Sequence, residues 1–173
     1  MTELNATAAS LLGFLHDGPK TGWDLLQEID AGFRHFWNVT SSHVYRELKG
    51  LHERGYIQPE ERSARDRQPY SITDEGRLAF AEWLAREPGG ETMRIPLLVT
   101  LWFGDRLEPS LLREFLANHR KVNEERLERY RTAPADRMAA DPYFAAVVEF
   151  GIAYEEAVLR WMDRLNDLPG LSS

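Results

Sequence analysis

Apolar residues recur at helical spacing through the first part of the chain. Residues 6–16 carry apolar side chains three or four positions apart, and the pattern stops at Gly18 and Pro19, which commonly end helices. A second helix is predicted to begin near Thr21 and to end near Gly32. Its apolar positions are Trp23, Leu26, Ile29 and Phe33.

The third predicted helix, residues 40–54, has two faces of different chemistry. Val44, Leu48 and Leu51 fall at i, i+4 and i+7 and form an apolar stripe. Thr40 can cap the helix, so that its free backbone amides and positive dipole end can face a phosphate. The polar face mixes hydroxyl, aromatic and basic side chains, which suits contacts with phosphates and base edges. It consists of Ser42, Tyr45, Arg46 and Lys49.

Gly55 ends this helix, and two short strands are predicted at residues 56–62 and 68–72. Pro59 and Pro69 cannot donate to a strand ladder, so the hairpin is predicted to be an exposed edge. Basic loop tips of such hairpins commonly contact the DNA backbone or minor groove. The basic residues of this loop are Arg62, Arg65 and Arg67. The alternative is an ordinary amphipathic helix with a solvated charged face, but the order of helix, glycine and basic hairpin favours DNA binding.

A fourth helix is predicted to begin at Thr73, a capping residue followed by two acids. Its expected buried positions are Leu78, Ala81 and Leu84, with Trp83 as a further candidate. The helix ends before the Pro-Gly-Gly cluster at residues 88–90, which is the best domain boundary in the chain. Three helices, a hairpin and a fourth helix predict a winged helix-turn-helix domain over residues 1–86.

Residues 87–173 are predicted to be entirely helical. Pro96 fits the first turn of a short apolar helix that ends at Gly104, and a long helix follows at residues 109–131. Two prolines bracket a predicted loop at residues 134–142. The last helix has an apolar face wider than one small partner helix would cover, which predicts packing against a second subunit; a self-contained bundle is the alternative. That face contains Val147, Gly151, Tyr154, Val158, Trp161 and Leu165.

Aromatic side chains of the second domain are the candidates for an effector site. They would line a cavity between the two domains that accepts a small aromatic molecule. Aromatic residues at helical spacing are more often plain core, and that alternative stays open. The candidates are Trp102, Phe103, Phe150, Tyr154 and Trp161.

The charge balance changes the expected mode of DNA binding. The chain carries a net charge of −7, and both predicted domains are acidic. Residues 40–70 nevertheless contain six Lys or Arg against five Asp or Glu. Because local potential governs docking, a locally basic face on an acidic protein predicts weak non-specific binding without excluding specific binding.

Other function classes find little support in the sequence. The chain has no cysteine, which excludes disulfides and thiolate metal sites and is consistent with a reducing cytoplasm. No secretion signal is visible, and the longest apolar run, residues 95–103, is too short to span a membrane. The histidines are scattered, and the glutamates at 124–128 pair with basic residues on a solvated helix face. We therefore expect a cytoplasmic protein that is no enzyme and needs no metal or cofactor.

Five short motifs occur in an order and spacing that are specific when taken together. They are Phe36-Trp37, Gly22-Trp23-Asp24-Leu25, residues 41–48 (Ser-Ser-His-Val-Tyr-Arg-Glu-Leu), residues 70–77 (Tyr-Ser-Ile-Thr-Asp-Glu-Gly-Arg) and residues 149–154 (Glu-Phe-Gly-Ile-Ala-Tyr). With them the chain resembles the PadR family of bacterial transcriptional regulators, in the branch with a long helical C-terminal domain. The chain departs from the family pattern at the acidic pair Glu60-Glu61 ahead of the wing loop, where a DNA-contacting surface would be expected.

The resemblance implies a homodimeric repressor that binds an inverted-repeat operator in double-stranded DNA and is released by a small-molecule effector. The family's namesake responds to phenolic acids. The implied fold is mainly α, with an N-terminal winged helix-turn-helix, a small β-hairpin wing and an all-helical C-terminal dimerisation domain. A winged-helix protein-interaction module and a transcriptional activator without small-molecule control are the alternatives. The implied DNA contacts are Lys20, Thr40, Ser41, Ser42, His43, Tyr45, Arg46, Lys49, Arg62, Arg65 and Arg67.

Overall fold

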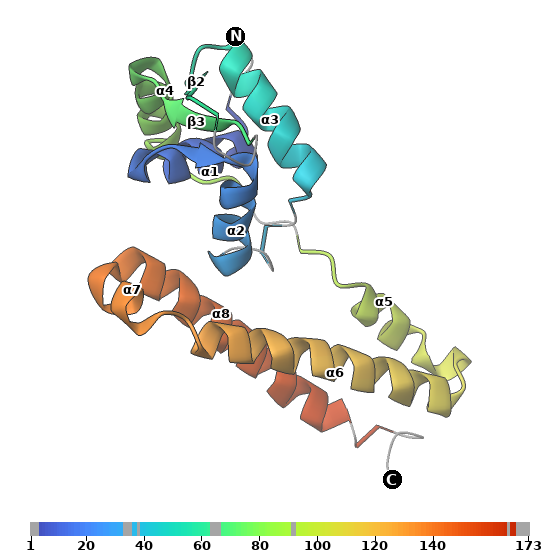
Figure 1. Cartoon of the computed structure of the whole chain (residues 1–173). Coiled ribbons are helices and arrows are strands. Elements are labelled where there is room, and N and C mark those ends of the chain that lie inside the picture. Colours follow the sequence, from blue (N-terminus) through green and yellow to red (C-terminus); the bar gives the residue numbers. More distant parts are fainter. Residues whose placement is uncertain are drawn as a thin grey trace. The chain divides into compact units, whose positions relative to one another are not determined.

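The chain forms two compact units, Met1–Gly90 and Glu91–Ser173, each of them mainly helical in the computed structural model (Figure 1). The first unit also carries a small antiparallel sheet. Among the described residues, no helix has the length and apolar character needed to cross a bilayer. The residues described are 4–32, 36–37, 39–62, 67–90, 93–165 and 167–168.

Three helices surround the core of the first unit. α1 (Ala6–Phe14), α2 (Gly22–Gly32) and α3 (Ser41–Glu53) pack against one another. The predicted apolar position Trp23 of α2 is 46% exposed, whereas Leu25, which was not predicted, is fully buried. α1 begins at a side-chain cap, because Asn5 Oδ1 accepts a hydrogen bond of 2.8 Å from the Ala8 amide. A short 3₁₀ helix, η1, extends α1. The largest fully buried side chains of this core are Leu11, Leu12, Leu15, Leu25, Ile29, Leu48, Leu51 and Ile57. The predicted apolar position Phe33 lies outside the described residues.

The sheet has three strands where the sequence predicts two. β1 (Lys20–Thr21) pairs with β3 (Pro69–Ile72), which also pairs with β2 (Ile57–Pro59), so that β3 is central. Pro69 therefore lies opposite Thr21 inside the sheet and does not mark an exposed edge. β1 escapes prediction because two residues are too short to show a period of two.

The fourth helix, α4 (Asp74–Leu84), begins where the sequence predicts, but it buries a different face. Thr73 caps it by accepting a hydrogen bond of 3.1 Å from the Gly76 amide. The expected burial of its leucines is wrong: Leu78 is 67% exposed and Leu84 is 59% exposed. Ala81 is exposed as well.

Gly76 explains which face of α4 meets the core. A Cβ at this position would lie 2.1 Å from the backbone oxygen of Tyr56. The backbone of α4 therefore packs directly against the backbone at Tyr56. Because Gly76 faces the core, the residues one and two helical turns after it on α4 face the core as well. Phe80 accordingly packs against the core, and Trp83 is half-buried.

The second unit is built on two long helices. α6 (Pro109–Arg131) and α8 (Pro142–Leu165) run side by side in Figure 1 and pack along their lengths. α5 (Pro96–Trp102) and the 3₁₀ helix η2 (Gly104–Arg106) precede them. The predicted loop at 134–142 instead contains a short helix, α7 (Ala135–Ala140). Six residues are too few for helical periodicity to be visible in sequence.

A buried carboxyl group lies between α6 and α8. Glu155 is completely buried, and neither of its carboxylate oxygens has a hydrogen-bond partner in the described part of the chain. It is ion-paired with Arg126, whose Nη1 lies 4.0 Å from Oε1. Burial raises the pKa of Glu155 above its ordinary value of 4.5, although Arg126 and Arg129 act in the opposite direction.

Replacing Glu155 with glutamine is expected to stabilise the protein at neutral pH. Because the folded-state pKa lies above the unfolded one, the native state binds the proton more tightly, and stability falls as pH rises from about 4.5 through the raised pKa. Removing the charge should add about 1–2 kcal/mol to the free energy of unfolding at pH 7, with a smaller gain at pH 5. Urea unfolding of both proteins at the two pH values measures this difference. A variant less stable at pH 7 would show that the ion pair with Arg126 outweighs the cost of burial.

Candidate nucleic-acid interface

α3 is anchored in the core by one face and presents the other to solvent. Val44 and Leu51 are fully buried, and Leu48 is nearly so, which confirms the predicted apolar stripe. Thr40 adopts extended backbone and its hydroxyl accepts a hydrogen bond from the His43 amide, as the predicted cap requires. The helix therefore has a fixed beginning and a fixed rotation about its axis.

The solvent face of α3 carries the predicted contact residues. Tyr45 is 55% exposed, and Arg46 and Lys49 extend further into solvent. Arg46 lies 3.9 Å from a carboxylate oxygen of the adjacent glutamate, and Lys49 lies 3.7 Å from Glu53. The Lys49–Glu53 pair is exposed on both sides and contributes little energy, so Lys49 can exchange it for a phosphate. In the other pair, Arg46 is exposed and its glutamate partner is largely buried. Also exposed on this helix and at its cap are Thr40, Ser41, Ser42 and His43.

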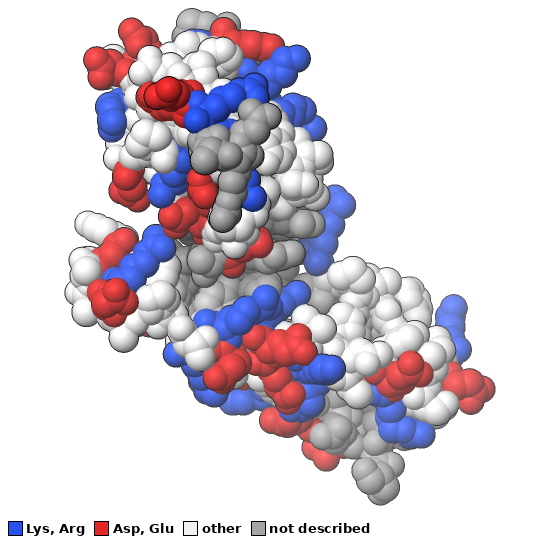
Figure 2. All heavy atoms as spheres, viewed as in Figure 1, with Lys and Arg blue, Asp and Glu red and all other residues white. Residues whose placement is uncertain are grey.

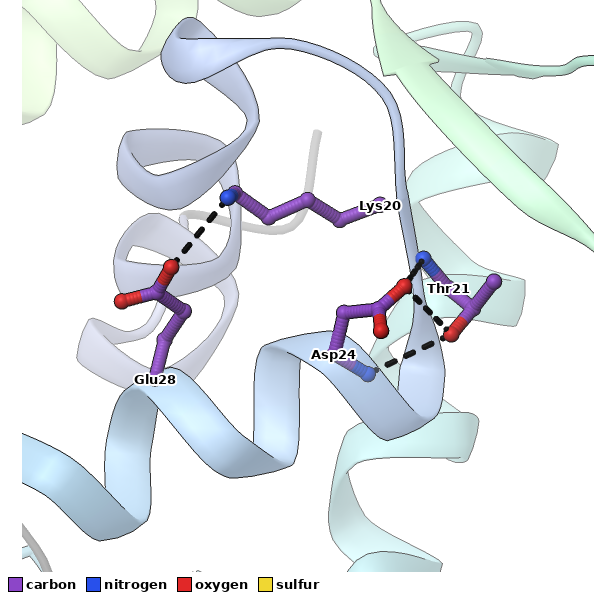
Figure 3. Close-up of polar contacts among 4 residues, drawn as sticks. All are labelled: Lys20, Thr21, Asp24 and Glu28. Carbon is purple, nitrogen blue, oxygen red and sulfur yellow. Dashed lines mark hydrogen bonds and ion pairs between the residues drawn. The ribbon is translucent and has the colours of Figure 1, made fainter.

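The corner between β1 and α2 is fixed by three hydrogen bonds between Thr21 and Asp24 (Figure 3). The carboxylate of Asp24 accepts hydrogen bonds from the Thr21 amide (2.8 Å) and the Thr21 hydroxyl (2.7 Å), while the Asp24 amide donates to that hydroxyl oxygen (3.2 Å). The Thr21 amide and then its hydroxyl lower the pKa of Asp24. Lys20, beside this clasp, is largely buried and ion-paired at 3.2 Å with Glu28, so a phosphate would have to replace that partner.

The wing residue Arg67 lies against α2. Its guanidinium carbon is 4.8 Å from the ring centroid of Trp23, within the range of a cation–π contact. Arg62 is exposed at the other base of the loop, and Arg65 lies outside the described residues. Helical spacing places Trp23 on the apolar side of α2, and its contact with Arg67 could not be predicted from that spacing.

Acidic residues accompany the basic ones on this unit, and Figure 2 shows Lys and Arg interspersed with Asp and Glu. Part of the acidic pair ahead of the wing is engaged within the hairpin: the Ser71 hydroxyl donates to the Glu60 carboxylate, and the Gln68 amide donates to the Glu60 backbone oxygen at 2.7 Å. On the face shown in Figure 2, exposed side chains of both signs among the described residues therefore contribute to the local potential.

Two family models match the chain in succession. The Transcriptional regulator PadR-like family matches residues 11–82, which contain the winged helix, and Virulence activator alpha C-term matches residues 93–168. Residues 11–82 thus belong to the PadR-like family of transcriptional regulators. This family consists of DNA-binding regulators and not of enzymes.

Similar proteins come from several bacteria. The negative transcriptional regulator PadR of Bacillus subtilis is 28% identical over 54% of this chain and 54% of its own length. Its crystal structure in complex with operator DNA has a TM-score of 0.78 at 20% identity, covering 95% of this chain and 97% of that one. The same protein in complex with p-coumaric acid has a TM-score of 0.68, covering 94% and 96% at 20% identity. The Vibrio cholerae virulence activator AphA has a TM-score of 0.72 at 22% identity, covering 92% and 95%.

The five aromatic effector candidates of this PadR-family chain lie in the second unit and differ in exposure. Trp102 is 82% exposed at the end of α5, and Phe103 follows it. Phe150 and Tyr154 stack on α8 with ring centroids 6.4 Å apart, and Tyr154 and Trp161 are half-buried. Trp102, Phe103 and Phe150 are exposed, whereas Tyr154 and Trp161 are half-buried, so the five do not share one degree of burial.

Proposed function

We propose that this PadR-family protein is a repressor that binds an inverted-repeat operator as a homodimer in the cytoplasm. The proposal rests mainly on the two faces of α3. One face is buried in the core, and the other exposes hydroxyl, aromatic and basic side chains together. The Bacillus subtilis relative described as a negative regulator, and solved with operator DNA, supports the same mode of action. In a two-fold dimer, the recognition helices would enter successive major grooves, about 34–36 Å apart.

Exposed apolar side chains of the second unit support self-association. α5, α6 and α8 leave large apolar residues in solvent, which a second copy of the chain would cover. They are Leu98, Val99, Trp102, Leu111, Val122 and Phe150. A monomer in sedimentation equilibrium at concentrations well above those used for DNA binding would contradict this part of the proposal.

The polar face of α3 divides into two roles in this proposal. Tyr45 and the serines at its beginning set the position of the helix on phosphates, while Arg46 contacts a base edge. Lys49 adds phosphate attraction one turn further along. Thr40 and His43 lie at the helix beginning, where free amides attract a phosphate. Outside α3, the residues proposed to contact the DNA backbone are Lys20, Arg62, Arg65 and Arg67.

Replacing Arg46 with alanine is expected to cost about 1–3 kcal/mol of operator affinity and to relax specificity at one position per half-site. The physical reason is that a guanidinium on a base edge discriminates among bases, whereas a phosphate contact does not. Competition binding with operators changed at each position measures both effects. Arg77→Ala is the control, since it removes an equal charge from α4 and leaves α3 unchanged. Uniform weakening on every sequence would make Arg46 a phosphate anchor.

We propose a small aromatic acid as the effector, bound near the aromatic residues of the second unit. The p-coumaric acid complex of Bacillus subtilis PadR supports this chemical class. Binding should change tryptophan fluorescence, because Trp102 and Trp161 are among the candidates. A screen of aromatic acids and planar drugs that gives no saturable change would remove the effector from the proposal.

Activation of transcription is the second candidate function. The match of the C-terminal half to Virulence activator alpha C-term and the likeness to AphA favour it. Repression and activation use the same contacts and differ in where the operator lies relative to the promoter. Mapping that position separates the two.

A further inference from the structure

Gly22, the first residue of α2, lies directly against the side chain of Tyr45 on α3. A Cβ added at Gly22 would come within 2.5 Å of Tyr45 Cε1, 3.0 Å of Tyr45 Cζ and 3.2 Å of Leu48 Cδ1. Real Cβ atoms essentially never lie closer than 3.0 Å to such a neighbour. The Tyr45 ring can therefore occupy its place because position 22 has no side chain.

The backbone at Gly22 is held from both sides, so it cannot easily move away from the ring. Thr21 pairs with Pro69 in the sheet, and the Thr21–Asp24 clasp in Figure 3 closes the turn around Gly22. Leu48, the other neighbour of position 22, is buried in the core. The Tyr45 side chain is more than half exposed and is the group that can yield.

We infer that Gly22 is a positioning residue for DNA recognition that acts through Tyr45. The inference rests on the proposed function, in which Tyr45 contacts the operator. Two elements fix the ring: α3 carries it, and the beginning of α2 braces it from the side. The hydroxyl is thereby presented at one place relative to Arg46 before DNA arrives, which reduces the side-chain ordering needed on binding.

An added methyl group at position 22 would displace the recognition side chain more than it would disturb the fold. The ring would swing toward solvent, because Leu48 and the clasp resist movement. Gly22→Ala is then expected to weaken selective binding about tenfold, the loss of one recognition contact. Gly50→Ala is the matched control on α3, because the nearest atom to its added Cβ is Arg54 Nη2 at 4.0 Å.

A double-mutant cycle on the full-length protein tests the inference. Gly22→Ala, Tyr45→Ala and the double variant are titrated onto the DNA fragment that the protein selects from its own upstream region, against a scrambled fragment. If Gly22 acts through Tyr45, the double variant should bind as Tyr45→Ala does, and Gly50→Ala should bind as the parent protein does.

The other outcomes separate this inference from the proposed function. The inference is overturned if Tyr45→Ala weakens selective DNA binding and Gly22→Ala does not. It is also overturned if Gly22→Ala weakens binding by the same factor in the Tyr45→Ala background. Both outcomes leave the proposed function standing. No loss with Tyr45→Ala overturns both the proposed contact and the inference. A second readout does not need Gly22→Ala to fold: ring-current shifts of the Gly22 α protons should be present in the parent protein and in Tyr45→Phe and lost in Tyr45→Ala. Unshifted α protons in the parent protein would overturn the inference.

Discussion

Replacing Gly76 with alanine is expected to destabilise the N-terminal unit by about 3 kcal/mol or more. The added Cβ would lie 2.1 Å from the Tyr56 backbone oxygen, 3.0 Å from its carbonyl carbon and 2.9 Å from Ile72 Cγ1. A backbone oxygen cannot rotate away as a flexible side chain can. α4 would have to shift away from Tyr56, which follows α3, and from Ile72 of β3. That shift would open the core against which Phe80 packs.

The sign of this effect distinguishes packing from helix propensity. Alanine in a helix interior is normally favoured over glycine by about 0.5–1 kcal/mol. Gly50→Ala in α3 should show that ordinary gain, because nothing lies closer than 4.0 Å to its added Cβ. Urea unfolding of the two variants beside the parent protein makes the comparison. A Gly76→Ala protein as stable as Gly50→Ala would contradict the close approach of α4.

Replacing Gly151 with alanine is expected to cost about 2–3 kcal/mol in the second unit. Three ring atoms of Tyr130 would lie 2.6–2.8 Å from the added Cβ, and this ring is buried between α6 and α8. Neither long helix can move without losing the apolar contacts along its length. The lower stability should appear in the unfolding transition of the second unit. The unfolding transition of the first unit should be unchanged.

A second substitution identifies the cause of this loss. In a Tyr130→Ala background the ring is gone, so Gly151→Ala should become neutral or slightly stabilising through helix propensity. If the penalty at Gly151 is the same with and without the ring, some other contact of α8 must explain it. A fully tolerated Gly151→Ala in the parent protein would contradict the packing of α8 on Tyr130.

The recognition helix could be predicted well because its sequence carries two independent signals. The spacing of Val44, Leu48 and Leu51 determines which face is buried, and Thr40 marks where the helix begins. These local rules were enough to place Tyr45 and Arg46 on the solvent face. The order of short motifs around them was enough to indicate the family.

Features that depend on close approach between distant segments could not be predicted. The rotation of α4 is set by Gly76 against Tyr56, and periodicity alone favoured Leu78 and Leu84 by mistake. The β1 strand depends on pairing with a segment about fifty residues away. Gly22 appears in the sequence only as part of a family motif, and its close approach to Tyr45 could not be predicted from it.

The measurement that tests the central claim most directly is a titration of the purified protein onto DNA from its own upstream region at several salt concentrations. The account predicts selective retardation of one fragment, with an affinity that falls with salt as expected for several phosphate contacts. It also predicts that this selectivity disappears in the Tyr45→Ala, Arg46→Ala double variant while the protein remains folded. A folded dimer that selects no sequence there or in a genome-wide selection, or a double variant that binds as well as the parent protein, would contradict recognition of DNA by α3.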